Sequence, residues 1–328
     1  MLLDQFDSNA YLQSATGSPD DGNQFFQPYL IHFDNPWDIV STGRLLLHKC
    51  HNADPVAYDR IYKGWIYFYL GLASFLLQDY EIAFFFIYNA VESDLDKFDP
   101  VTNPSHAMRL IQLDSELPEH KDFIGDAEKR IDALIQIYNI RPESKNLNLP
   151  ELRKNFLRPT IKANRKNWGT LATTFISFCL EWNYRDQLFT LCPEPNASEP
   201  YFLHLFKGCL LFESLLKNNP NCPAPNITSN LGDELKRLKT QLGIHDKSKL
   251  NINGKTLSQV VNKINQEGEN SLPTAMQYTG WLRNTLGHNL GWGVSLNKSQ
   301  YQRLFEMVAS SCIHAISKLY DPLAKGNP

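Results

Sequence analysis

One short segment, residues 274–292, carries the side chains with the clearest chemical potential. Arg283 is followed directly by Asn284, and His288 lies five positions after the arginine. An unperturbed histidine titrates near neutral pH, so His288 can act as a general acid or base. Arg283 stays protonated and presents a planar fork that fits phosphate oxygens, while Asn284 can hydrogen-bond a substrate or fix the imidazole tautomer. These residue types predict chemistry at a phosphate group.

The spacing constrains how these residues are presented. In a regular helix, residues five apart point about 140° apart around the axis, so Arg283 and His288 do not share a face. We expect Gly287 to break the helix immediately before His288 and to redirect it. The alternative is an ordinary solvent-facing pair near a helix C-terminus, where cations are favoured.

The segment resembles the signature of HEPN ribonucleases (higher eukaryotes and prokaryotes nucleotide-binding domains). Their motif is an arginine, a polar residue, several further positions and a histidine, which Arg283, Asn284 and His288 match. The resemblance implies an all-α helical bundle with the motif near its C-terminal end, which fits residues 199–322. It also implies a homodimer in which both copies of the motif line one composite cleft, and a role in prokaryotic anti-phage or CRISPR-associated defence.

The resemblance further implies metal-independent cleavage of single-stranded RNA, with Arg283, Asn284 and His288 as catalytic residues and no cofactor. In that reaction the ribose 2′-OH attacks the adjacent phosphate, the leaving 5′-oxygen is protonated, and charge on the phosphorane is stabilised. The products are a 2′,3′-cyclic phosphate and a 5′-hydroxyl. The alternatives are a relative that binds RNA or a nucleotide without cleaving it, and a chance match of the motif.

A rival hypothesis from another class is a non-catalytic helical scaffold, or an RNA-binding or dimerisation subunit of a defence complex. An enzyme must lose activity when Arg283 or His288 is replaced by alanine. A scaffold tolerates both replacements and instead fails when the helical surface around residues 67–80 is altered.

A second candidate feature is the basic run within residues 153–166. Several of its cations fall on one helical stripe, although Pro159 must kink the helix, and the aromatic residues Phe156 and Trp168 flank it. One interpretation is a surface that leads RNA phosphates to the cleft, and the other is a solvated helix face. The nucleic-acid-binding candidates are Arg158, Lys162, Arg165 and Lys166.

The elements that must position these residues are helices. From about residue 54 onward, apolar residues recur with helical spacing, broken by proline and asparagine clusters, and alternating strand patterns are almost absent. The sequence therefore predicts an all-α fold. The expected helices are 55–77, 80–95, 105–115, 124–139, 149–164, 168–181, 183–191, 199–218, 230–242, 255–266, 272–286 and 298–320.

Breaks in composition divide the chain into four expected parts. Residues 1–28 are polar and rich in Ser, Gly, Asp and Pro, so we expect a poorly ordered segment there. The polar segments 141–150 and 192–200 contain prolines that mark boundaries. The remaining parts are a helical domain at 29–148, basic connecting helices at 149–198 and a HEPN-like helical domain at 199–328.

Residues 64–95 have the pattern of a helical hairpin. The small residues Gly71, Ala83 and Ala90 allow two antiparallel helices to approach closely, with a turn at 78–79. This pattern resembles a single tetratricopeptide repeat (TPR), which implies a TPR-like N-terminal domain able to bind a protein partner. The alternative is that any helical hairpin with small residues in its seam has the same pattern.

Composition excludes several classes of protein. The chain has 328 residues, of which 42% are hydrophobic and 20% charged, and a net charge of −3, which rules out collagen, wholesale disorder and a surface that is basic throughout. The most apolar stretch, 65–90, is interrupted by charged residues before it could span a membrane. His48, Cys50 and His51 are too crowded for a metal site. We expect a soluble, cytoplasmic protein with no membrane partner.

Overall fold

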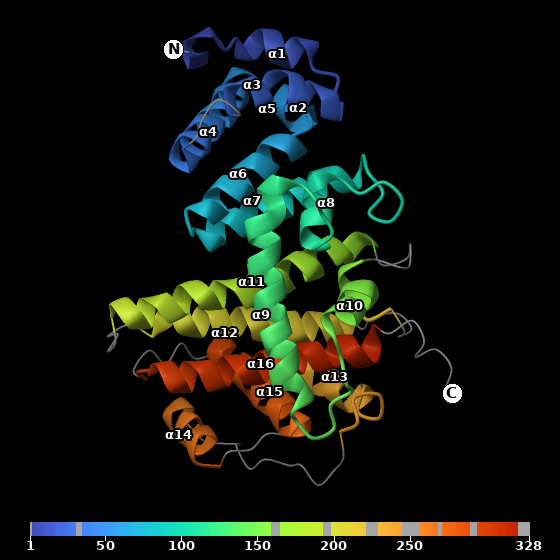
Figure 1. Cartoon of the computed structure of the whole chain (residues 1–328), viewed down its shortest axis with the longest axis vertical. Helices are drawn as coiled ribbons and strands as arrows, with labels where there is room; N and C mark the ends of the chain where they lie inside the picture. The colour runs from blue at the N-terminus through green and yellow to red at the C-terminus, as the bar shows by residue number, and fades with distance from the viewer. Residues whose placement is uncertain are drawn as a thin grey trace. The chain divides into compact units, whose positions relative to one another are not determined.

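The computed structural model describes residues 2–30, 35–158, 165–192, 198–220, 229–244, 256–267, 271–288 and 294–320. All regular secondary structure in these ranges is helical, which confirms the predicted all-α fold (Figure 1). None of the helices described in these ranges is long and apolar enough to cross a membrane.

The chain divides into two compact units, Met1–Ile124 and Gly125–Pro328. We expected the division near residue 148, in the segment framed by prolines. That segment instead folds back onto helix α9 (Lys121–Asn139), because the Asn139 side-chain amide donates to the Leu147 carbonyl at 2.8 Å and Leu147 is buried. The prolines therefore mark an internal turn of the second unit.

The expectation that residues 1–28 are poorly ordered is wrong. Phe6, Tyr11 and Phe26 are buried in one aromatic cluster of the first unit. The polar residues between them are helix caps: Asp7 accepts backbone hydrogen bonds at the start of α1, and Ser18 forms a capping box at the start of α2. The helices here are η1 (Leu2–Gln5), α1 (Ser8–Ser14), α2 (Pro19–Phe25) and α3 (Gln27–Leu30).

Next comes α4 (Pro36–Ala53), a long helix that the sequence did not predict. It is followed by α5 (Pro55–Arg60). Asn35 caps α4, and Cys50 on its inner face is fully buried. His48 and His51 lie on exposed positions of the same helix, so these three residues do not converge on one point. No group of three or more metal-ligating side chains is found among the described residues.

The predicted hairpin consists of α6 (Gly64–Leu76) and α7 (Tyr80–Leu95). A Cβ atom added to Gly71 would lie 2.7 Å from the Ile87 side chain, and Ala83 and Ala90 are fully buried. Small residues therefore permit the close approach of the two helices, as the sequence predicted. The first unit is completed by α8 (His106–Ile111), η2 (Pro118–His120) and the start of α9.

The second unit holds the remaining helices, and its longest member is α11 (Arg165–Leu191). We expected two helices in this range, but no proline or glycine interrupts 171–191, so the helix runs through. The other elements are α10 (Leu149–Leu152), a π-helical turn η3 (Arg153–Leu157), α12 (Glu199–Lys217), α13 (Leu231–Arg237), α14 (Leu257–Glu267), α15 (Leu272–His288) and α16 (Lys298–Leu319).

Helix α12 is the centre of the second unit, since it packs against α11, α15 and α16. Gly208 makes this packing possible. A Cβ atom at Gly208 would overlap the Phe178 ring of α11 and would lie 2.7 Å from Val308 Cγ1 of α16. The interior around this point is aromatic, with Phe178, Phe212 and Phe305 fully buried.

We predict that Gly208→Ala destabilises the protein by about 1 to 3 kcal/mol, because the added methyl overpacks the core. Gly125→Ala is the matched control: Gly125 is an exposed helical glycine of α9, and nothing lies within 4 Å of an added Cβ. That control should gain up to about 1 kcal/mol through helix propensity. Denaturant unfolding measures both changes, and equal effects of the two substitutions would contradict the packing account.

Candidate functional site

Helix α15 carries the sequence motif and presents it at the edge of the core. Its inner face buries Met276, Leu282 and Leu286. Arg283 is partly exposed and Asn284 is exposed. Both therefore lie on the outward face of the helix, whose opposite face is buried in the core. The helix therefore places the arginine and the asparagine at the surface.

The guanidinium of Arg283 is fixed by a carboxylate on α12. Its Nε donates to Glu213 Oε2 at 2.7 Å, and the Arg283 side chain keeps 26% of its surface exposed. Lys217, one turn along α12, donates to the other carboxylate oxygen, Oε1, also at 2.7 Å. Glu213 is 6% exposed. Its single negative charge balances one of two cations, so the three residues together carry a charge of +1 that favours an anion.

The outer edge of the guanidinium remains available. Its Nη1 lies 3.5 Å from Asn284 Oδ1, which is a long contact, and no described residue accepts from Nη2. Because Nε is the atom bound to Glu213, the two terminal nitrogens can face a phosphate as a fork. This arrangement is suited to holding a phosphate oxygen pair.

The structure corrects the expectation about Gly287. Helix α15 does not break before His288 but continues through it, and Gly287 keeps a right-handed helical backbone. Nothing crowds Gly287, since an added Cβ would lie 3.5 Å from the Phe206 ring, an ordinary contact. Arg283 and His288 therefore sit about 140° apart around one regular helix, and the side chain of His288 lies outside the described residues.

The basic run is only partly described. Arg158 is exposed and follows the π-helical turn η3, whereas Lys162 and the side chains of Arg165 and Lys166 lie outside the described residues. The two flanking aromatic residues are not a stacking platform. Phe156 is 3% exposed, and Trp168 is 5% exposed with its indole N–H donating to the Leu157 carbonyl at 3.1 Å.

Sequence reasoning missed two glutamates, Glu181 and Glu213, that each bind two cations among the described residues of this unit. Glu213 pairs with Lys217 and Glu181 with Arg185, in each case four residues apart on one helix. Glu181 also forms an ion pair with Lys207 of α12, with 2.5 Å between the Lys207 Nζ and Glu181 Oε1 atoms. These ion pairs could have been predicted from an acidic residue followed four positions later by a basic one in a mainly apolar helix. That spacing places the two side chains on one face of the helix.

Two buried histidines of the second unit, His204 and His314, are structural. His204 Nε2 lies 2.8 Å from the Phe178 carbonyl, which can only accept, so that nitrogen carries the proton and Nδ1 accepts from the Tyr301 hydroxyl at 2.6 Å. Burial holds the pKa of His204 well below its usual value. Burial likewise lowers the pKa of His314 to about 4. Both rings are neutral at physiological pH and enclosed, so neither can exchange protons with a bound substrate.

No protein-family model matches the chain, and no curated protein or solved structure is significantly similar to it. The HEPN assignment and the repeat assignment therefore stay predictions. What the structure adds is the environment of Arg283 and Asn284.

We predict that Arg283 and Glu213 are energetically coupled. In a double-mutant cycle of Arg283→Ala and Glu213→Ala, the coupling free energy should be about 1 to 2 kcal/mol, because either single change leaves a partly buried charge with an altered partner. The matched control is the exposed pair Asp233 and Lys236, whose charged atoms are 3.9 Å apart. Its coupling should stay below about 0.5 kcal/mol. Additive effects at Arg283 and Glu213, measured by denaturant unfolding, would contradict the site geometry.

Proposed function

We propose that the chain is a metal-independent endoribonuclease that acts on single-stranded RNA. The observation that supports this proposal best is the fixed, outward-facing guanidinium of Arg283. Its Nε is bound to Glu213, its terminal nitrogens remain available, and the cluster with Lys217 has a net positive charge. A preorganised cation of this kind stabilises the charge that develops on a phosphate during transfer.

In the proposed reaction, Arg283 binds the non-bridging oxygens of the scissile phosphate. The ribose 2′-OH attacks that phosphate, the bond to the 5′-oxygen breaks, and the proton lost by the 2′-OH is balanced by the one gained by the leaving oxygen. His288 is assigned to proton transfer and Asn284 to positioning the substrate. The products are a 2′,3′-cyclic phosphate and a 5′-hydroxyl, and the motif's resemblance to HEPN enzymes suggests a setting in prokaryotic defence.

The angle between Arg283 and His288 around helix α15 supports a homodimer. Because α15 is regular through His288, Arg283 and His288 of one copy diverge around the axis. Two copies related by a two-fold axis can place the arginine of one beside the histidine of the other. We therefore propose that the cleft is composite.

A non-catalytic scaffold is the second candidate, and one observation favours it. The α6–α7 hairpin exposes Leu76, Ile82 and Phe85, with 57%, 40% and 58% of their surfaces accessible. Large apolar side chains gathered on one hairpin are typical of a protein-binding surface. In that case, replacing Arg283 or His288 leaves function intact, whereas Phe85→Asp abolishes partner binding.

The test of the ribonuclease is cleavage of labelled single-stranded RNA in EDTA. The wild type should cleave, whereas Arg283→Ala and His288→Ala should each lose at least about 100-fold in rate, as expected for removal of a charge-stabilising or proton-transfer group. Lys236→Ala, which removes an exposed cation of the same unit, should retain full activity. Equal cleavage by all four proteins, or none by the wild type, counts against the proposal.

A further inference from the structure

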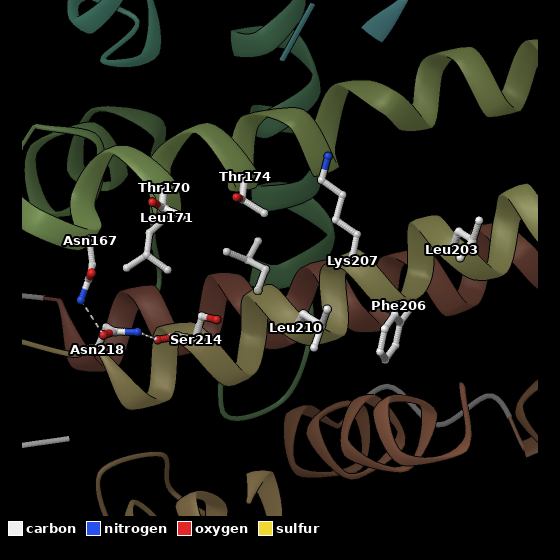
Figure 2. A pocket seen from close by; sticks show the side chains of 11 residues that line it. Asn167, Thr170, Leu171, Thr174, Leu203, Phe206, Lys207, Leu210, Ser214 and Asn218 are labelled. Carbon is white, nitrogen blue, oxygen red and sulfur yellow. Dashed lines mark hydrogen bonds between the residues drawn. The ribbon is translucent and has the colours of Figure 1, made fainter. Parts of the chain in front are cut away.

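A bounded groove lies between α11 and α12, in the same unit as Arg283 but with no contribution from it (Figure 2). Its volume is about 480 Å³, within the range of cavities that hold small molecules. The floor and rim are mainly apolar, with Leu171 and Leu211 buried and Leu203 and Leu210 50% and 41% exposed. A ligand would cover leucine surface that now faces water.

Two polar bridges join the helices along this groove. At one end, the Asn167 amide of α11 donates to the Asn218 side-chain oxygen of α12 at 2.7 Å. Farther along, Lys207 of α12 extends toward α11 (Figure 2), where its ammonium donates to the Ser177 hydroxyl and to Glu181 Oε1. Lys207 and Asn218 are eleven residues apart, about 16 Å along a helix. A partner helix running through the groove would have to break a bridge, whereas a small elongated ligand fits between them.

The charge of the side chains that line the groove determines how a ligand is oriented in it. Among the described residues that line the groove, Lys207 is the one charged side chain, and no acid is present. Its side chain is 33% exposed. An ammonium has three donors, and Ser177 and Glu181 use two of them. The third donor has no hydrogen-bond partner among the described residues, and Lys207 lines the groove. Lys207 shares the Glu181 carboxylate with Arg185, so the three residues carry a net charge of +1, which suits one negative charge on a ligand.

We propose that the α11–α12 groove binds an elongated amphiphilic monocarboxylate. The carboxylate accepts from Lys207, and the apolar body lies along Leu171 and Leu210 toward the Asn167–Asn218 bridge. This proposal is independent of the ribonuclease proposal, because Arg283 does not line the groove and no catalytic step is involved.

The experiment is calorimetric titration of the full chain with dodecanoate below its micelle-forming concentration, and with dodecan-1-ol as the uncharged control ligand. The wild type should bind dodecanoate saturably at one site. Lys207→Gln should weaken dodecanoate at least tenfold and leave dodecanol unchanged. Ser214→Phe, which fills the groove from a half-exposed position, should weaken both ligands at least tenfold, and Arg283→Ala should change neither.

Three results would overturn the proposal: no saturable binding of dodecanoate, equal binding by the wild type and Ser214→Phe, or a loss with Arg283→Ala in place of Lys207→Gln. Circular dichroism checks that each variant is folded. Should Ser214→Phe fail to fold, Leu210→Glu provides a second change at a 41% exposed position, where the added carboxylate should repel dodecanoate at least tenfold.

Discussion

The close approach at Gly208 is the constraint on which the second unit depends. Without a side chain there, α12 can lie against Phe178 of α11 and Val308 of α16, while α15 packs on another side. Because of this central position, α12 contributes residues both to the Arg283 site and to the α11–α12 groove. Glu213 of α12 binds Arg283, and Lys207 of α12, which lines the groove, binds Glu181 of α11. A shift of α12 would therefore disturb both.

Two buried carboxylates fix the positions of the partly exposed cations Arg283 and Lys207. Glu181 and Glu213 are nearly inaccessible, and each binds two basic side chains. A buried carboxylate without such partners would be costly, so the pairing is enforced by desolvation. The consequence for function is geometric: Arg283 and Lys207 are long, flexible side chains that would otherwise sample many rotamers, and an acid holds each in one.

Local patterns predicted much of the fold, since apolar spacing located most of the helices from residue 55 onward. The errors arose where composition misled. The polar residues around Asp7 and Ser18 are caps of short helices, and the prolines after Asn139 belong to a turn held by side-chain hydrogen bonds. The candidate site was only half predictable. Arg283 was identified from its motif, but its partner Glu213 is 70 residues away, and no periodicity connects residues on different helices.

In the proposed function, Arg283 supports cleavage at a ribose 2′-OH without a metal ion. This role is tested most directly with an RNA strand that is 2′-O-methylated at all nucleotides except one, incubated with the full chain in EDTA. Mass spectrometry of the products should show one cut, directly 3′ to the unmodified nucleotide, with a 2′,3′-cyclic phosphate end and no cut by Arg283→Ala. Cuts at methylated positions, 3′-hydroxyl ends, or an intact strand would contradict the account.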